Sequence, residues 1–279
     1  MIESRPSPIA GLWYPADPRQ LRSEIQQYLD EAVYYPILGE LRALLVPHAG
    51  YRYSGKTAAY AYQYLIGKPI ETVYILSPYH DYHPADFLTP AHSAYETPLG
   101  FVDIDQEVLN SINDAMLMKT GCSIQSVTRD KEHSLEIQLP FLQSVLAQPF
   151  RIIPIMVRSR NPQNCHELGD IIADHFQPNN SLLIASTDLS HFYHEKLAHQ
   201  LDAVIINAVR NNQPADIFKA EDNKSGFACG AGAVTTVMWA NKKLDVNHTE
   251  ILYYTTSAEE TRDAQSVVGY AAAAFYQIP

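Results

Sequence analysis

Short apolar runs that end abruptly in polar residues are the feature that most constrains how this chain can fold. Three such runs are "RALLVP" (42–47) before His48, "ETVYILSP" (71–78) ahead of His80, and "SLLIAST" (181–187) before Asp188. Continuous apolar runs of this length are typical of strands that are buried on both faces of a sheet. Because the carboxyl ends of parallel strands meet at one edge of a sheet, we expect these polar residues to gather there.

Amphipathic helical patterns separate the apolar runs. Asp17 and Pro18 read as an N-cap and a first helical residue, and the apolar spacing that follows predicts a helix over 18–33. Further helices are predicted over 55–66, 106–117, 134–146 (with Pro140 kinking it or starting a new segment), 165–176, 196–211 and 231–240. Further strands are predicted over 150–157, 250–258 and 266–276, with an antiparallel excursion within 84–104. This alternation predicts an α/β fold, with helices on both faces of a mostly parallel or mixed central sheet. The absence of a linker-like composition shift favours a single domain over 1–279.

Composition excludes several classes of protein. Of the 279 residues, 46% are hydrophobic and 18% are charged, which is ordinary for a globular protein and wrong for a disordered one. The net charge of -11, with no basic cluster, argues against nucleic acid as a partner. No apolar run approaches the length of a membrane span, and the first residues lack a signal-peptide pattern. Three cysteines cannot form a disulfide framework, so we expect reduced thiols and a cytoplasmic location.

The residues at the predicted sheet edge have the chemistry of a transition-metal site. The imidazoles of His48 and His80 suit iron, copper or zinc, and Cys229 is the candidate third ligand. Cys229 precedes a predicted helix, whose dipole would favour the thiolate. Asp188 and His191 would orient a ligand or move protons beside the metal.

Structural interpretations compete with each of these roles. His48 and His80 could be hydrogen-bonded loop residues, Asp188 could cap a helix that begins at Leu189, and Cys229 could be a small core residue. His133, in "DKEHSLEIQLP", is an acid/base or substrate contact at the sheet edge in one interpretation. In the other, it belongs to a capping arrangement at a helix start, built from Asp130, Ser134 and nearby acids.

The sequence also resembles a known family. The segments that carry the resemblance are "AGLWYPADPRQL" (10–21), "PHAGYRYSGKTAAYAY" (47–62), "ILSPYHDYH" (75–83), "EHSLEIQLPFL" (132–142), "ASTDLSH" (185–191) and "ACGAGAV" (228–234). In order and spacing they are similar to the signatures of the Memo family, whose bacterial and archaeal members are called AmmeMemoRadiSam system protein B. The resemblance runs from about residue 8 to the C-terminus, and the motifs are specific as a set.

The resemblance implies a three-layer αβα fold akin to the class III extradiol dioxygenases, which are non-haem iron enzymes. It implies a metal site at His48, His80 and Cys229, with Asp188 and His191 beside it, and links to iron, copper and redox chemistry. The family name implies radical-SAM pathway proteins as partners. The dioxygenase relatives use two histidines and a carboxylate, whereas this chain offers the oxidisable thiolate of Cys229, which puts catechol-ring cleavage in doubt.

Three functional hypotheses follow. The first is a metal-dependent redox protein of oxygenase type, with iron(II), or else copper, and a small polar or phenolic substrate; His191 or His133 would act as acid and base. The second is a hydrolase, either metal-free with Cys229 as nucleophile, His191 as base and Asp188 as its orienter, or zinc-dependent. The third is a peptide-binding module without catalysis that retains the pocket, for which the 18 tyrosines would supply contact surface. We favour the first.

Overall fold

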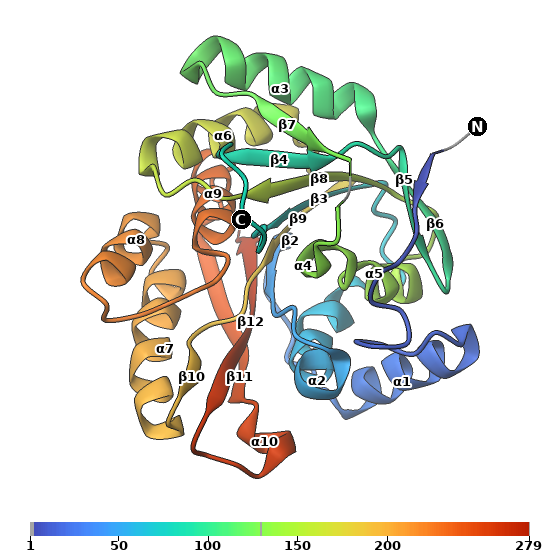
Figure 1. Ribbon diagram of the computed structural model, residues 1–279, viewed down its shortest axis with the longest axis vertical. Helices are drawn as coiled ribbons and strands as arrows, with labels where there is room; N and C mark the ends of the chain where they lie inside the picture. Colours follow the sequence, from blue (N-terminus) through green and yellow to red (C-terminus); the bar gives the residue numbers. More distant parts are fainter. Residues whose placement is uncertain (1–2, 129, 279) are drawn as a thin grey trace.

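A parallel four-stranded core forms the centre of the sheet in the computed structural model, which describes residues 3–128 and 130–278 (Figure 1). The strands lie in the order β8 (Arg151–Val157), β3 (Thr72–Ser77), β9 (Ser181–Ser186) and β2 (Glu40–Val46), and all three neighbouring pairs are parallel. Nearly all of their residues are buried, as the continuous apolar runs predict. The carboxyl ends of all four strands therefore lie at the same edge of the sheet.

The outer strands make the sheet mixed. On one side, β12 (Val267–Gln277) runs antiparallel to β2 and pairs with β11 (His248–Thr256) and β10 (His191–Tyr193). On the other side lie β6 (Gly100–Ile104), β5 (Ala94–Thr97), β1 (Ser4–Arg5), β4 (Phe87–Pro90) and β7 (Ile124–Val127). The pairing of β5 with β6 is antiparallel, which confirms the excursion predicted within 84–104.

Helices cover both faces of the sheet, which completes the predicted three-layer αβα arrangement (Figure 1). One layer contains α1 (Pro18–Glu31), α2 (Tyr51–Tyr62) with the 3-10 turn Gln63–Leu65, α4 (His133–Glu136) and α5 (Leu139–Val145). The other contains α3 (Gln106–Thr120), α6 (Pro162–His175), α7 (Glu195–Arg210), α8 (Pro214–Asp222) and α9 (Ala231–Lys243). The short α10 (Ala258–Thr261) follows β11 and contacts α2. Within the part of the chain that the structure describes, no helix is both long and apolar enough to cross a membrane.

Local sequence signals explain where several helices begin. The Asp17 carboxylate accepts hydrogen bonds from the backbone N–H groups of Arg19 and Gln20, so it caps α1 as predicted. Pro140 lies in the first turn of α5 and splits the predicted helix 134–146 into α4 and α5. α2 begins at Tyr51, four residues before the predicted start at 55.

The interpretation of Asp188 as a helix cap is wrong. No helix begins at Leu189 in the described chain; the segment continues as an extended connection into β10. The backbone N–H of Leu189 donates to the Gly269 carbonyl (2.9 Å), and the Gly269 N–H donates to the Ser190 carbonyl (3.0 Å). Because β12 takes up these backbone groups, they are not available for helical hydrogen bonds. Asp188 therefore faces the sheet edge, where it takes part in the candidate site.

Candidate metal centre

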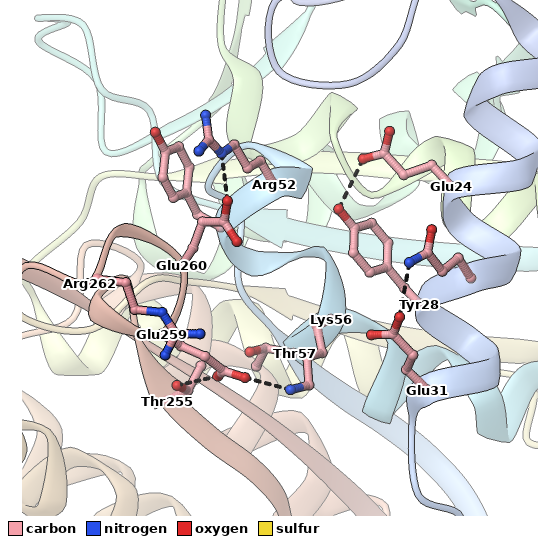
Figure 2. Close-up of a pocket in the computed structure, with 12 residues that line it drawn as sticks. Glu24, Tyr28, Glu31, Arg52, Lys56, Thr57, Thr255, Glu259, Glu260 and Arg262 are labelled. Atoms are coloured by element: carbon pink, nitrogen blue, oxygen red, sulfur yellow. Dashed lines mark hydrogen bonds and ion pairs between the residues drawn. The ribbon is translucent and has the colours of Figure 1, made fainter.

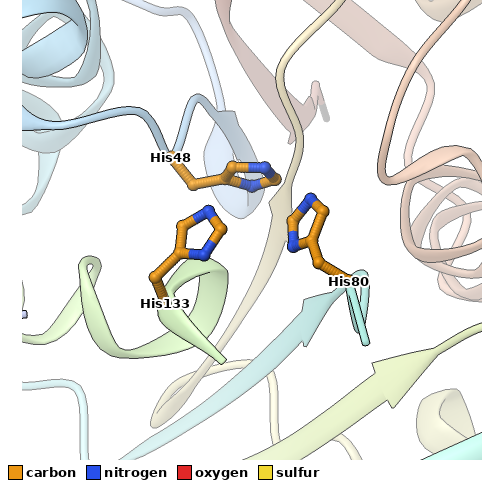
Figure 3. A group of neighbouring side chains, drawn as sticks. All are labelled: His48, His80 and His133. Carbon is orange, nitrogen blue, oxygen red and sulfur yellow. The ribbon is translucent and has the colours of Figure 1, made fainter. Parts of the chain in front are cut away.

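Three histidines from distant parts of the chain converge at the carboxyl edge of the sheet. His48 follows β2, His80 follows β3, and His133 is the first residue of α4. One ligand atom from each imidazole lies within 4.8 Å of the others, and Figure 3 shows the three rings turned toward a common space. The His80 and His133 rings stack with centroids 4.7 Å apart, while the His48 ring stands nearly perpendicular to both. Such a group of nitrogen ligands fits a transition metal.

Hydrogen bonds around His48 fix which of its ring nitrogens carries the proton. The ring is 1% exposed, and Nδ1 lies 3.0 Å from Ser186 Oγ. That hydroxyl donates its one hydrogen to the Ser134 carbonyl (2.6 Å) and accepts from Gln138 Nε2 (2.9 Å). Its remaining capacity is that of an acceptor, so His48 Nδ1 carries the proton. Nε2 of His48 then carries the lone pair, as a metal ligand requires, and its neighbour is Cys229 Sγ at 3.1 Å.

Glu132 holds the other two imidazoles. Its Oε1 lies 2.9 Å from His80 Nδ1 and 3.3 Å from His133 Nδ1, and its Oε2 accepts the backbone N–H of His80 (2.6 Å). Glu132 also caps α4 by accepting the Ser134 N–H (2.8 Å), and Asp130 accepts the Glu132 N–H (2.8 Å). The predicted capping arrangement of Asp130, Ser134 and a nearby acid is therefore present, with Glu132 as the N-cap residue. When a carboxylate accepts the Nδ1–H of a histidine, Nε2 carries the lone pair and becomes more basic. Metal-binding imidazoles are usually supported in this way.

The pKa values of these groups follow from burial and from the shared carboxylate. Burial lowers the pKa of His48 well below its ordinary value, and burial lowers that of His133 to about 4. Burial also lowers the pKa of His80, but hydrogen bonding and charge attraction from Glu132 outweigh this and raise it. For Glu132, burial raises the pKa, but the hydrogen bonds from His80 and the Ser134 N–H, together with charge attraction to His80 and His133, outweigh burial and lower it. At neutral pH, His48 and His133 are thus neutral imidazoles, the form in which histidine binds metals.

A buried arginine at the start of the chain braces the loop that carries Glu132. Arg5, on β1, donates to the backbone carbonyls of Asp130 (3.1 Å) and Glu132 (2.6 Å) and pairs with the Asp130 and Glu136 carboxylates. Glu136, which lies one turn after His133, is bound by Arg5, Ser7 and Tyr14 rather than by the histidine. Contacts that depend on the N-terminal strand therefore fix the position of the carboxylate beneath the imidazoles.

Cys229 contacts His48 but does not belong to the group of three histidines. Its Sγ is 3.1 Å from His48 Nε2 and accepts the backbone N–H of Asp188 at 3.1 Å. α9 begins two residues later, at Ala231, as the sequence predicts. Burial raises the pKa of the Cys229 thiol, and the Asp188 carboxylate raises it further. The expectation that the helix start favours the thiolate is therefore wrong for the protein without a cation at the site, because burial and a neighbouring carboxylate outweigh the dipole.

Asp188 and His191 lie at the same edge, but they do not form a relay with Cys229. The Asp188 carboxylate accepts the backbone N–H of His48 (2.7 Å) and is 3% exposed, and burial raises its pKa to about 7. His191 Nδ1 is bonded to the Leu189 carbonyl (2.8 Å), and burial lowers the pKa of its ring. In the described chain, Asp188 thus orients the His48 backbone rather than the His191 ring.

A cavity of about 410 Å³ opens beside the histidines. Its wall contains the polar residues His48, His80, His133, Asp188 and His191, together with Leu12, Trp13, Ala49, Gly50, Tyr53, Val268 and Tyr270. The Trp13 ring packs on His133 with centroids 4.1 Å apart. All three clustered imidazoles therefore face one cavity that is large enough for a small molecule.

Figure 2 shows a larger, charged hollow of about 610 Å³. Tyr53 lines both the histidine cavity and this hollow. Arg52 pairs with Glu260 (2.7 Å) and Lys56 with Glu259 (2.5 Å), so residues of α2 and α10 are joined across it. These charges are largely matched within the hollow itself. The imidazoles lie in the smaller cavity, which is therefore where metal chemistry would take place.

Comparison with known proteins places this architecture in a family. A sequence profile described as "Memo-like protein" matches residues 5–274. The chain belongs to the Memo-like family. This Memo-like protein is 32% identical to a MEMO1 family protein of Nitrosopumilus maritimus, an alignment that covers 96% of this chain and 98% of the relative. It is 34% identical to one from Methanopyrus kandleri (96% and 97% covered) and 30% identical to one from Saccharolobus solfataricus (96% and 97%). The resemblance seen in the sequence motifs is confirmed.

Sequence reasoning about this Memo-like protein missed Glu132, Ser186 and Arg5. Glu132 directly precedes His133 in "EHSLE", and Ser186 ends a predicted strand in "IASTD", so both lie within segments that already contain candidate residues. An acid next to a histidine and a hydroxyl at a strand end are weak signals of residues that hold a metal-binding imidazole in place. Arg5 has no such signal, since its role depends on β1 lying near the loop 130–136.

Proposed function

We propose that this Memo-like protein is a metal-dependent redox protein of oxygenase type, with iron(II) as its metal and copper as the alternative. The observation that carries the proposal is the convergence of the His48, His80 and His133 ligand atoms within 4.8 Å of one another. His48 and His80 also have Nδ1 bound to Ser186 and Glu132, which leaves Nε2 as the nitrogen that would bind a metal. Bound iron(II) would supply redox chemistry and open coordination positions for dioxygen and a small phenolic substrate.

Two ligand sets share His48 and His80. In the first, Cys229 is the third ligand, supported by the 3.1 Å between its Sγ and His48 Nε2; in the second, His133 is the third ligand, supported by the cluster itself. We favour Cys229, because its sulfur already lies 3.1 Å from Nε2 of His48, the nitrogen that would bind the metal. A cation there would oppose the effects that raise the thiol pKa. His133 would then be left to contact the substrate.

Protein groups around the metal would hold and move the substrate's proton. His191 has Nδ1 bound to a backbone carbonyl, so Nε2 is the atom of its ring that is free to accept a proton. Because burial lowers the pKa of His191, the ring is neutral and ready to act as a base at pH 7. The Asp188 carboxylate also lines the cavity. By accepting the backbone N–H of His48, it would hold the His48 segment in place. Trp13 and Tyr270 would keep water from the substrate face.

Metal analysis of protein prepared without oxygen tests this function. We expect near-stoichiometric iron in the wild-type protein and loss of that iron in His48→Ala. If Cys229 is the third ligand, Cys229→Ser changes the metal's X-ray absorption spectrum by loss of sulfur scattering, whereas His133→Gln leaves the sulfur scattering unchanged. Protein that contains no iron or copper after such preparation, and that does not take up either metal, would reject the proposal.

A thiol hydrolase is the second candidate, because Cys229 Sγ lies 3.1 Å from a histidine nitrogen. The partner in this geometry is His48 rather than the predicted His191. The raised pKa of the thiol opposes it, since a nucleophilic cysteine needs a readily formed thiolate. Chelator-resistant ester hydrolysis that is lost in Cys229→Ser would favour this candidate, and hydrolysis restored by zinc after chelation would indicate a zinc hydrolase.

A further inference from the structure

We propose that Tyr270 is a ligand-contacting residue of the 410 Å³ cavity beside the histidines, and that its hydroxyl donates a hydrogen bond to an acceptor oxygen of the bound molecule. Only the choice of cavity rests on the proposed function. The new element is a contact through which the cavity would select its ligand by chemistry as well as by size.

Tyr270 differs from the other deeply buried tyrosines in the partner of its hydroxyl. Of the six tyrosines in the described chain that are at most 3% exposed, five donate the hydroxyl hydrogen to a carboxylate, an amide oxygen or a backbone carbonyl. These five are Tyr14, Tyr51, Tyr62, Tyr74 and Tyr95. Tyr270, at 2%, makes no hydrogen bond through its hydroxyl to any described residue. Buried tyrosine hydroxyls normally have a partner, so this one is left for a molecule in the cavity.

The Tyr270 hydroxyl lies on the cavity side of its ring. Burial raises the pKa of the phenol, and the neighbouring Asp188 and Tyr53 raise it further. Both neighbours line the same cavity as Tyr270. Because their charges act on the phenol oxygen, that oxygen lies on the side of these two residues. The hydroxyl keeps its proton at neutral pH and is therefore available as a donor.

Strand β12 brings Tyr270 near the His191 ring. Val268 pairs with His191 of β10, and Tyr270 follows Val268 by two positions. Alternate residues of a strand lie on the same face, and all three of these residues line the cavity. Because His191 Nδ1 is bonded to the Leu189 carbonyl, Nε2 is the acceptor of that ring. A ligand oxygen that accepts from Tyr270 would thus lie near the imidazole that we propose as the base.

A buried donor without a partner selects ligands that carry an acceptor. A hydrocarbon group placed against the Tyr270 hydroxyl would exclude water and leave the hydrogen without a partner, at a cost in binding free energy. An acceptor oxygen in the same place would form the missing hydrogen bond. The cavity should therefore distinguish two ligands of one shape that differ only in this oxygen.

Stability measurements test whether the hydroxyl has a partner within the fold. Tyr270→Phe removes an oxygen that bonds to no described residue, so it should leave the midpoint of urea unfolding unchanged or slightly raised. The matched control is Tyr74→Phe, which should lower the midpoint because the Tyr74 hydroxyl donates to the His175 carbonyl (2.9 Å). A loss in Tyr270→Phe equal to that in Tyr74→Phe would overturn the inference.

Two ligands of nearly the same shape test the contact itself: cyclohexanone, which carries an acceptor oxygen, and methylenecyclohexane, which does not. Both are titrated into chelator-treated wild-type and variant proteins, with the amide NMR signals of the cavity residues as the readout. We expect Tyr270→Phe to weaken cyclohexanone binding about fivefold, which corresponds to about 1 kcal/mol, and to leave methylenecyclohexane binding unchanged. Tyr74→Phe should change neither affinity.

Equal weakening of both ligands in Tyr270→Phe, or of neither, would overturn the inference, as would the absence of cyclohexanone binding to the wild-type protein at tens of millimolar. The infrared carbonyl frequency of bound cyclohexanone is a second readout. It should be lower in the wild-type protein than in Tyr270→Phe, because a hydrogen bond weakens the C=O bond, and equal frequencies would contradict the contact. Iron content is measured separately. Since no titration requires a metal, the Tyr270 contact can fail while the metal proposal stands, and the reverse.

Discussion

At the residue scale, one carboxylate controls two of the three imidazoles. Glu132 accepts from both the ring and the backbone of His80 and lies 3.3 Å from the His133 ring nitrogen. The sequence singled out all three histidines because each lies near the end of a strand or the start of a helix. It could not reveal Glu132 as the common support of His80 and His133, because that role depends on the loop after β3 meeting the start of α4 in space.

Glu132→Gln should weaken metal binding about 10- to 100-fold while leaving the fold intact. The amide would present an N–H₂ group toward one of the N–H groups that the carboxylate now accepts, so at least one imidazole would lose its orientation. Competition with a chelator of known affinity measures the change. The control is Glu96→Gln, an exposed carboxylate on β5. Wild-type metal affinity in Glu132→Gln would show that the carboxylate does not support the ligands.

His133 should make stability sensitive to acid. Its pKa is about 4 in the folded protein, against 6.5 for an ordinary histidine, so the unfolded chain binds more protons between these values. The free energy of unfolding therefore falls as the pH drops from 6.5 to 4, by at most about 1.4 kcal/mol per pH unit from this group. The measurement is urea unfolding of wild type and His133→Gln with chelator present. As the pH drops, the free energy of unfolding should fall more steeply in the wild-type protein than in His133→Gln. A difference between the two proteins that does not vary with pH would contradict the assigned pKa.

At the element scale, long patterned segments were predictable and short ones were not. The helix that begins at Pro18 and the strands β3, β8 and β9 have bounds within about two residues of those expected. Each is long enough to show its own pattern, apolar residues at helical spacing in the helix and a continuous apolar run in each strand. β1 and β10 contain two and three residues, too few to show a period, and they exist because neighbouring strands accept their backbone groups. α8 was also missed, since Pro214 at its start was not read as a helix signal.

Capping at the start of α1 should be measurable. Asp17→Ala removes the acceptor for two backbone N–H groups and is expected to lower the free energy of unfolding by about 0.5–2 kcal/mol. Asp30→Ala, near the other end of the same helix, removes an exposed carboxylate from the negative end of the dipole and should be neutral or slightly stabilising. Chemical denaturation of both variants makes the comparison. Equal losses in the two would indicate a general effect of charge rather than a cap.

At the scale of the whole molecule, the sequence predicts the layers but not the order of the strands. Parallel pairing places β3 beside β9, more than a hundred positions later, and the N-terminal β1 beside β5. Arg5 reaches the segment 130–136, which includes α4, only through this order, so a residue at the start of the chain supports the candidate metal centre. The parallel core explains why His48 and His80 lie close together, as expected: adjacent β2, β9 and β3 end at one edge, whichever order they take. The cytoplasmic location and radical-SAM partners stay predictions from the sequence.

Metal binding should stabilise the whole fold, because the ligand atoms come together only when β2, β3 and α4 are in place. A ligand that binds the folded state alone adds about 2.7 kcal/mol at a concentration of 100 Kd. Anaerobic thermal unfolding of chelator-treated protein should therefore show a midpoint that rises by several degrees when iron(II) is added. His48→Ala should lose this rise, whereas His248→Ala, at an exposed position on β11, should keep it. A rise of equal size in His48→Ala would mean that iron stabilises the protein from elsewhere, since a site at the sheet edge cannot form without the nitrogen that follows β2.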